Sequence, residues 1–372
     1  MHVPYPFLRE QDRTSGSTVL PYQLYLAFQE MGYKVDLITG SRAARLRKVM
    51  EFARNRKLDR YLFCFSELSP YPVHPIIDYA FYLLLWVNKV PTGIYYTDAY
   101  WKFPNLFAQP GFRRLLLLLR YRFDLLVFSR AASLFFFPTG AMADVFPLRC
   151  PKVVLPFGGK VLFPGSRTRP EIDTAIYVGG ISHRYGAAVL LGAFDLINES
   201  TRLDLELVCR EDELEREQAV FAPYSSARWL HIHHLGGDAL HGVYHKSDLA
   251  IIPLLKNVYN DIVIPVKMFE YLSHGLPIVA TNCTEIANFI THNGVGLVAE
   301  DNVESLTEKI LQLVRDRDLY EELKRNVRCT LENGNLWTDR ARLVAQQLTA
   351  LDKRHQRKGG LHQGPDSVPS LS

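Results

Sequence analysis

Short apolar runs alternate with longer stretches of helical periodicity along most of this chain. Runs of this kind, bounded by turn residues, are predicted to be strands buried on both faces of a parallel sheet. In the first half they cover residues 33–39, 60–65, 93–97 and 134–137, after a short opening run at 2–5. In the second half they cover residues 174–180, 203–208, 230–233, 249–253, 277–280 and 296–298. Helices are predicted between them, notably at 187–197, 267–273, 303–315 and 337–348, and this alternation predicts an α/β chain with parallel sheets.

The size and composition predict a globular protein of about two domains, with 372 residues of which 48% are hydrophobic. Five cysteines are scattered without a CxxC pair, which indicates a reducing, cytoplasmic setting rather than a disulfide framework. The opening residues lack the pattern of a signal peptide, and no apolar stretch reaches the roughly 18–20 residues that span a membrane. Residues 353–372 are polar and contain several glycines and prolines, so they are predicted to be a disordered tail.

Charge is distributed unevenly along the chain. The net charge of +4 combines +10 in residues 1–160 with −6 in the remainder. Two basic segments with helical spacing of apolar residues, 42–60 and 112–122, suit an anionic membrane surface. The alternative is a solvated basic face on the first segment and a buried core stripe on the second. Nucleic-acid binding is not expected, because no nucleic-acid-binding motif accompanies the charge.

The segment 265–281 has the strongest chemical signal. Pro265 suits the first turn of a helix, and Gly275 suits its end. Lys267 and Glu270 stand three residues apart, so both project from one face of the opening turns. A helix start favours an anionic ligand, an ammonium group adds to that preference, and a carboxylate accepts hydrogen bonds from ribose hydroxyls. The segment therefore fits a nucleoside diphosphate, and the alternative is a surface Lys–Glu pair on an ordinary amphipathic helix.

This segment resembles the donor site of GT-B glycosyltransferases, in the large nucleotide-sugar-dependent family of glycosyl transferases group 1 (family 4-like). The resemblance implies two Rossmann-like domains that face a central cleft, with an acceptor-side domain at residues 1–157 and a nucleotide-sugar domain at 158–336. It also implies that residues 153–164 connect the domains and that a last helix, 337–352, packs back on the first domain. Related chains usually open with more apolar residues, which leaves open whether residue 1 is the natural start. In this family the lysine contacts the donor pyrophosphate and the glutamate holds the ribose.

Five further residues are candidates for donor binding by the same resemblance. Gly179 and Gly180 follow a strand and precede a helix, where glycines let the backbone approach a diphosphate. Arg184 is one residue away from the usual position of a basic residue in that loop, and the glycine turn is equally compatible with a purely structural role. Arg210 follows the strand at 203–208, near where the nucleobase usually lies. Glu285 matches a donor-side glutamate of many relatives, but its spacing from Asn282 also fits a helix capping box, which we favour.

Two candidates lie in the first half of the chain. Gly16 is in a serine-rich loop that resembles the first-domain loop facing the donor pyrophosphate, and a simple turn is the alternative. Asp98 follows a predicted strand at the expected cleft, where it would take the acceptor's proton in an inverting enzyme or orient substrates in a retaining one. Asp98 also fits a helix N-cap. Many retaining relatives carry a second glutamate eight positions before Glu270, where this chain has Ile262, so the stereochemical outcome stays open.

No metal or cofactor is expected. His231 and His233 share one face of a predicted strand, but no partner carboxylate is evident from the sequence. Asp316 and Asp318 lie in a charged helical run, where their side chains diverge. The charge of the departing diphosphate would therefore be stabilised by Lys267, Arg184 and helix N-termini.

The sequence thus predicts a cytoplasmic, peripheral membrane hexosyltransferase. Its donor would be a nucleotide-diphosphate sugar, with UDP expected as the nucleotide, and its acceptor a lipid-linked or growing glycan of cell-surface polysaccharide synthesis. Two alternatives share the fold: an epimerase or hydrolase of nucleotide sugars, and a non-catalytic binding subunit. A nicotinamide-dependent dehydrogenase is disfavoured, because no Gly-x-Gly-x-x-Gly follows the opening strand.

Overall fold

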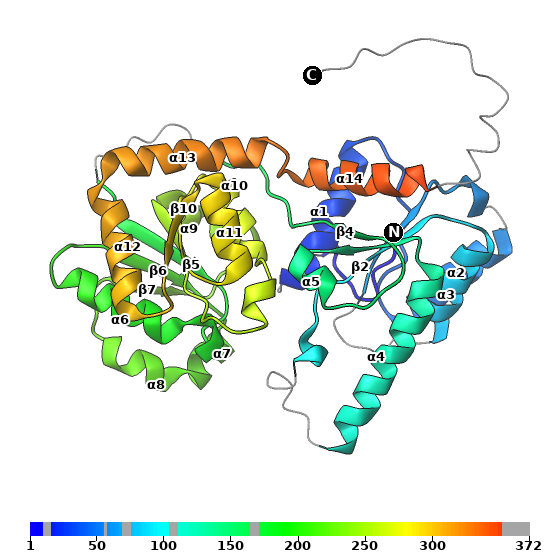
Figure 1. Cartoon of the computed structure of the whole chain (residues 1–372), viewed down its shortest axis with the longest axis horizontal. Coiled ribbons are helices and arrows are strands. Elements are labelled where there is room, and N and C mark those ends of the chain that lie inside the picture. Colours follow the sequence, from blue (N-terminus) through cyan, green and yellow to red (C-terminus); the bar gives the residue numbers. More distant parts are fainter. Residues whose placement is uncertain (10–15, 56–57, 69–75, 104–110, 164–170, 352–372) are drawn as a thin grey trace, which may run out of the picture.

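The computed structural model describes residues 1–372 except 10–15, 56–57, 69–75, 104–110, 164–170 and 352–372. Its described part contains two parallel sheets (Figure 1). The first sheet has the order β1 (Cys64–Glu67), β2 (Thr92–Tyr95), β3 (Leu134–Phe137) and β4 (Lys152–Val154). The second has the order β10 (Gly296–Ala299), β9 (Ile278–Thr281), β8 (Leu249–Ile252), β5 (Thr174–Val178), β6 (Asp204–Val208) and β7 (Leu230–His233). The α/β prediction with parallel sheets is confirmed.

Helices flank both sheets. Those of the first half are α1 (Gly16–Glu30), α2 (Arg42–Asn55), α3 (Ile76–Val87), α4 (Phe112–Ala131) and α5 (Gly140–Asp144). Those of the second half are α6 (Ala187–Asn198), α7 (Glu211–Arg216), α8 (Gln218–Phe221), α9 (Leu240–Lys246), α10 (Val266–Ser273), α11 (Thr284–Asn293), α12 (Val303–Arg315), α13 (Arg317–Glu332) and α14 (Trp337–Ala350). None of the described helices is both long and apolar enough to cross a membrane.

The continuous apolar runs form the buried centres of both sheets. Every residue of β1, β2, β3, β8 and β9 is buried, as expected for strands covered by helices on both faces. The predicted strand at residues 60–65 was placed too early, because the buried run begins at Cys64 and continues to Glu67. Residues 33–39 do not form the predicted strand either. Only Ile38 bridges to His2, and His2 in turn bridges to Ser66 of β1, so the opening segment lies between residue 38 and the first sheet.

The chain crosses between the sheets twice. It leaves β4 at Val154 and enters β5 at Thr174, and it returns through α14, which packs against α1 and β2 (Figure 1). Gly93 in β2 makes this packing possible, because a Cβ there would lie 2.6 Å from the ring of Phe136 and 3.0 Å from Leu348. The predicted tail at 353–372 lies outside the described residues.

Arg340 anchors the return crossing. This arginine of α14 is buried, and its guanidinium donates to the carbonyl oxygens of Phe157 at 3.0 Å and Gly334 at 2.9 Å. A third bond joins it to the amide oxygen of Asn335 at 2.5 Å. Both crossings are therefore tied together by one side chain.

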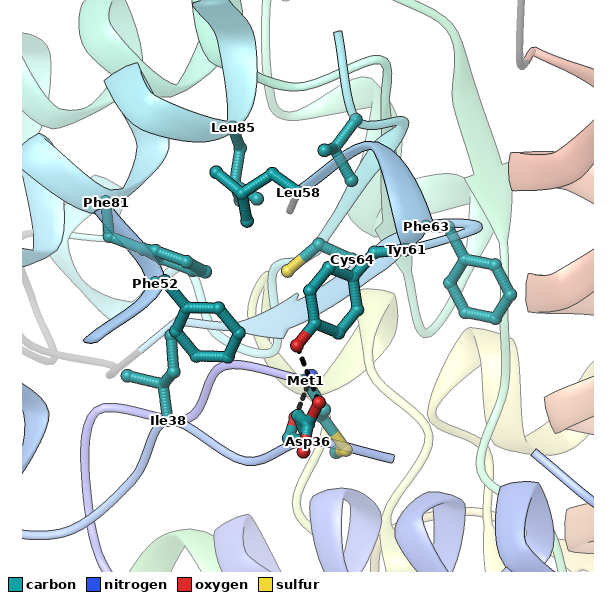
Figure 2. A pocket seen from close by; sticks show the side chains of 11 residues that line it. Met1, Asp36, Ile38, Phe52, Leu58, Tyr61, Phe63, Cys64, Phe81 and Leu85 are labelled. Carbon is teal, nitrogen blue, oxygen red and sulfur yellow. Dashed lines mark hydrogen bonds between the residues drawn. The ribbon is translucent and has the colours of Figure 1, made fainter. Parts of the chain in front are cut away.

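A small cavity of about 30 Å³ lies at the amino ends of the first sheet's strands (Figure 2). Met1, Asp36, Cys64 and Phe81 are among its lining residues, and the Met1 ammonium donates to the Asp36 carbonyl oxygen at 2.7 Å. The volume leaves room for little more than ordered water, which needs about 10–15 Å³ per molecule. Ligands of parallel α/β sheets bind at the carboxyl ends of the strands, so this cavity is a packing gap at the opposite edge.

Candidate functional site

Helix α10 carries the Lys267–Glu270 pair. Pro265 is its N-cap, with φ −77° and ψ 147°, and not the first helical residue as predicted. The helix ends at Ser273, and Gly275 follows with φ 73°, a left-handed conformation that glycine adopts without a steric cost. Lys267 therefore lies in the first turn, where unbonded backbone N–H groups and the positive end of the helix dipole favour an anion.

The ammonium group of Lys267 is buried without a hydrogen-bond partner among the described residues. It lies 4.1 Å from the ring centroid of Tyr177 and 5.8 Å from that of Tyr185. Burial lowers the pKa of Lys267 to about 7, against the opposing effect of the carboxylates of Glu270 and Glu213. A buried cation with no bonded anion is costly, and a bound anion would remove much of that cost.

The glycine loop after β5 lies against this ammonium. Gly179 has φ 143°, and a Cβ there would lie 2.7 Å from the Lys267 Nζ. A Cβ on Gly180 would lie 2.5 Å from the ring of Tyr185. Gly179 is thus required by its backbone angle and Gly180 by the Tyr185 ring, and the structure brings both together with Lys267. The loop ends at Gly186, whose Cα faces the carbonyl of Pro253 and precedes α6.

Glu270 is held by a residue that the sequence analysis did not single out. The hydroxyl of Tyr244, on α9, donates to the Glu270 Oε2 at 3.3 Å. Burial raises the pKa of Glu270, while this hydrogen bond and the charge of Lys267 oppose the rise. Tyr244 also stacks on the ring of His274, with ring centroids 4.3 Å apart and planes 11° apart. The pair fixes the direction in which Glu270 presents its carboxylate.

Asp98 lies at the carboxyl end of β2, where the second half of the chain reaches the first sheet. It accepts a hydrogen bond from the hydroxyl of Tyr259, a side chain with 6% of its surface exposed. Burial raises the pKa of Asp98 to about 6, while Tyr259 and the charge of Arg184 oppose the rise. The capping interpretation of Asp98 is wrong, since Ala99 caps the short helix Tyr100–Lys102 and no side chain makes the capping bond.

Arg184 lies beside the same group of aromatic rings. Its guanidinium is 5.4 Å from the ring centroid of Tyr100 and 4.5 Å from that of Tyr185, whose hydroxyl it meets at 2.6 Å. Tyr259 stacks on Tyr100, with centroids 4.5 Å apart. Arg184 is thus next to Asp98 on one side and the glycine loop on the other.

Comparisons with known proteins bear on the fold and on part of the second half of the chain. Residues 173–316 match the family described as glycosyl transferases group 1. This part of the second half is therefore similar to group 1 glycosyltransferases. Sucrose-phosphate synthase from Thermosynechococcus elongatus has a similar fold, with a TM-score of 0.65 and 14% identity over 94% of this chain and 99% of that one.

Two further solved structures show the GT-B fold for the whole chain. HepE from Anabaena, solved in complex with UDP and glucose, has a TM-score of 0.66 and 13% identity over 94% of this chain and 99% of that one. WaaG, a glycosyltransferase involved in lipopolysaccharide biosynthesis, has a TM-score of 0.59 and 14% identity over 94% of this chain and 98% of that one. The predicted GT-B fold is therefore confirmed.

Ile262 lies at the position where many of the retaining relatives carry a glutamate. This residue lies in the short helix Asn260–Ile262, and its carbonyl oxygen accepts a hydrogen bond from Thr139 Oγ1 at 2.5 Å. The adjacent Asp261 does not replace the missing glutamate, because its Oδ1 accepts from both the backbone N–H and the hydroxyl of Thr284 at 2.9 Å.

The remaining donor-site candidates are spread over three elements. Gly16 begins α1, and residues 13–15 of its loop lie outside the described residues. Arg210 is the exposed N-cap of α7, directly after β6. Glu285 lies in the first turn of α11, where burial raises its pKa. The capping-box interpretation of Glu285 is wrong, because Cys283 is the N-cap and Asn282 donates to Glu300.

The histidines of β7 do have carboxylate neighbours, contrary to the expectation from sequence. His233 contacts Glu206 on β6, and His231 lies 3.8 Å from Asp204. Glu206 also pairs with Lys246 at 2.7 Å, so its carboxylate is already neutralised. Asp316 caps α13 by accepting from the backbone of Leu319 at 2.9 Å. No cluster of three metal-binding side chains occurs in the part of the chain that the structure describes.

Proposed function

We propose that this chain transfers a hexosyl group from a UDP-linked sugar to a glycan or lipid-linked acceptor. The observation that supports it most is the buried Lys267 ammonium, which lies against the Gly179 loop without a bonded anion among the described residues. A diphosphate bound at the start of α10 would meet this cation, the free N–H groups of the helix and the dipole end together. Glu270 would then accept hydrogen bonds from the ribose. The solved HepE complexes with UDP and UDP-glucose support a uridine donor by analogy.

The residues of the cleft have complementary roles in this proposal. Lys267 and Arg184 stabilise the negative charge that develops on the diphosphate as the sugar–phosphate bond breaks. Asp98 lies on the acceptor side, and its carboxylate accepts the hydrogen bond of the attacking hydroxyl. It takes that proton if the reaction inverts the anomeric centre, and it orients the hydroxyl if the reaction retains it.

The membrane part of the proposal rests on α4 and α3. Apolar side chains at helical spacing are largely exposed on α4, namely Phe112, Leu115, Leu119, Phe123 and Leu126. The interpretation of this segment as a buried core stripe is therefore wrong for these residues. The neighbouring α3 exposes Leu83, Trp86 and Val87.

The charge on the same helix fits an anionic surface. Arg113, Arg120 and Arg122 are exposed on α4 beside the apolar side chains. An exposed apolar face flanked by arginines suits the headgroup region of an anionic leaflet. We therefore propose that the protein works on the cytoplasmic face of the cell membrane, in cell-surface polysaccharide synthesis.

A donor screen tests the proposed function. Thermal shifts with UDP-, GDP-, ADP- and TDP-sugars should show stabilisation by one nucleotide class, and Lys267→Met should weaken that binding by about 1.5–3 kcal/mol, the range for a charged hydrogen bond. Lys246→Met is the matched control, because Lys246 is paired with the carboxylate of Glu206 on β6. Mass spectrometry of membrane extracts then identifies the glycosylated product. Donor breakdown without any new glycan would instead indicate a hydrolase.

A further inference from the structure

A second buried carboxyl group lies next to Asp98. Glu67 is the last residue of β1, its side chain is 1% exposed, and its register partner on β2 is Tyr95. The Thr97 hydroxyl donates to the Glu67 Oε1 at 3.2 Å, and Thr97 immediately precedes Asp98. The Oε2 has no hydrogen-bond partner among the described residues.

Within the described residues, no basic side chain is among the groups that influence the pKa of Glu67. The titratable groups that face it are the hydroxyls of Tyr5 and Tyr95 and the carboxylate of Asp98. On the return helix, the guanidinium of Arg340 acts on Tyr95 and is bonded to two carbonyl oxygens and Asn335.

Asp98 is in the opposite situation. Asp98 is partly exposed and accepts a hydrogen bond from the Tyr259 hydroxyl. The positive charge of Arg184 also stabilises its ionised form. Two adjacent carboxyl groups in a buried site do not both ionise easily, and the better stabilised one takes the charge. Burial and the charge of Asp98 raise the pKa of Glu67 to about 8, against its hydrogen bonds from Tyr5 and Thr97. At neutral pH, Asp98 is therefore ionised and Glu67 keeps its proton.

We propose that Glu67 is a positioning residue of the acceptor site, where its uncharged carboxyl group holds the Thr97–Asp98 turn and leaves Asp98 as the single anion facing the acceptor hydroxyl. The role rests on the proposed function, since it concerns the acceptor side of that same cleft. Glu67 acts through Thr97 and Asp98 and does not itself touch the reacting atoms. Ionisation of Glu67 at high pH would add a second negative charge behind Asp98 and disturb the turn.

The charge state of Glu67 is tested without any turnover. We compare the unfolding free energies of the wild type and Glu67→Gln between pH 4 and pH 9. Below about pH 4.5 the carboxyl is protonated in both the folded and the unfolded chain, so the two proteins should differ little. From about pH 4.5 to about pH 8 the unfolded chain releases a proton that the folded chain keeps, so the advantage of Glu67→Gln should grow with pH. A difference that does not change with pH overturns the proposal.

The positioning role is tested by the pH dependence of turnover. The donor selected by the thermal-shift screen is used at a concentration that saturates the site at every pH, so that deprotonation of Lys267 does not limit the rate. Water is the acceptor, and UDP release is measured from pH 5 to pH 9.5. The wild-type rate should fall several-fold above about pH 8, and this alkaline limb should vanish in Glu67→Gln. Glu67→Ala should lose about tenfold at pH 7 where Glu67→Gln keeps most activity, because glutamine restores the bond to Thr97. An alkaline limb that persists in Glu67→Gln overturns the role.

Asp124→Asn is the matched control. Asp124 is 2% exposed, its pKa is raised to about 6 by burial, and it accepts a hydrogen bond from Tyr79 where α3 and α4 meet. Asp124→Asn should change how the unfolding free energy depends on pH. It should leave the fall in turnover at alkaline pH unchanged.

A turnover-free measurement separates failure of this role from failure of the proposed function. The titration of the Asp98 carboxyl, followed by NMR in aspartate-labelled protein, should be unchanged in Glu67→Gln and displaced in Glu67→Ala. An Asp98 titration that moves to lower pH in Glu67→Gln would mean that Glu67 is charged, and it overturns the proposal. A wild type that binds a donor without turning it over contradicts the proposed function alone.

Discussion

The hydroxyl of Tyr259, carried by the loop between β8 and α10, donates a hydrogen bond to the carboxylate of Asp98 at the end of β2. These residues are 161 positions apart in the chain. Tyr259 packs with the apolar core of the first half of the chain, although it lies within residues 173–316, which match the group 1 family. The contact therefore links the two halves of the chain through one tyrosine.

Removing that hydroxyl should make Asp98 harder to ionise. The bond from Tyr259 lowers the pKa of Asp98, which burial otherwise raises to about 6, so Tyr259→Phe should move the acidic limb of the rate profile to higher pH. We expect the rate at pH 6 to fall several-fold more than the rate at pH 8. Tyr224→Phe, which changes a tyrosine packed against Trp229 in the second half of the chain, should leave the limb in place. Equal losses at both pH values would show that Tyr259 contributes only packing.

Donor binding should take up a proton at neutral and mildly alkaline pH. The buried Lys267 has a pKa of about 7 without a ligand, and a bound diphosphate would raise it again because the charged form gains a partner. Affinity for UDP should therefore decrease as pH rises from about 7 to 9, and calorimetry in buffers of different ionisation enthalpy should report proton uptake. In Lys267→Met the uptake should disappear. A UDP affinity that is constant over this range would argue against contact between Lys267 and the diphosphate.

Lys267 should also lower the unfolding free energy of the ligand-free protein. A lysine with a lowered pKa destabilises the fold below about pH 7, and the penalty disappears as the pH approaches 10.5, where the unfolded chain also loses the proton. We expect Lys267→Met to raise the unfolding free energy of the ligand-free protein at pH 6 more than at pH 10. Chemical denaturation at the two pH values checks the sign.

Tyr244 should matter for the donor but not for the acceptor. Tyr244→Phe keeps the stacking on His274 and removes one hydrogen bond to Glu270, which is worth about 1 kcal/mol at the observed length of 3.3 Å. We expect about a fivefold increase in the donor KM with little change in kcat. Tyr320→Phe removes a buried hydrogen bond to the Asp248 carbonyl oxygen and serves as a control that costs stability alone. A KM increase of similar size in both variants would contradict the assignment.

Helix α4 should bind the protein to anionic membranes. The double variant Leu119→Glu/Phe123→Glu changes two exposed side chains, so it should fold normally and bind phosphatidylglycerol vesicles at least tenfold more weakly. Leu196→Glu changes an exposed leucine of α6 and should bind as the wild type does. Cosedimentation at low and high salt measures the effect. Absence of vesicle binding by the wild type would refute the membrane proposal.

The features that could be predicted best from the sequence are those determined by residues close together in the chain. The start of α10, the glycine that follows it and the Lys267–Glu270 spacing are all set by residues close in the chain. Tyr244, Tyr259 and Glu67 were missed because each reaches its partner from a different element, and nothing near them in the sequence marks that contact. Tyrosines next to apolar residues look like core residues, and a single glutamate at the end of a strand looks like a surface residue.

The errors in strand placement have a similar origin. Residues 33–39 have an apolar pattern, but they lie at the margin of the first sheet, where only Ile38 completes a bridge. The capping box at Asn282 failed because α11 begins one residue later, with Cys283 as its N-cap, and the Asn282 Oδ1 accepts no hydrogen bond from the described residues. Local patterns predict which residues are available for a contact, and the tertiary structure decides which contact is made.

The return of α14 to the first sheet affects where the chain can be truncated or joined to a relative. A stop codon after residue 336 would follow the apparent end of the nucleotide-binding half, yet it would strip Leu348 and its neighbours from Gly93 and α1. The truncation would therefore destabilise the first half of the chain, although it removes no residue of that half. Chimeras that exchange donor specificity should therefore keep the last helix from the same parent as residues 1–157.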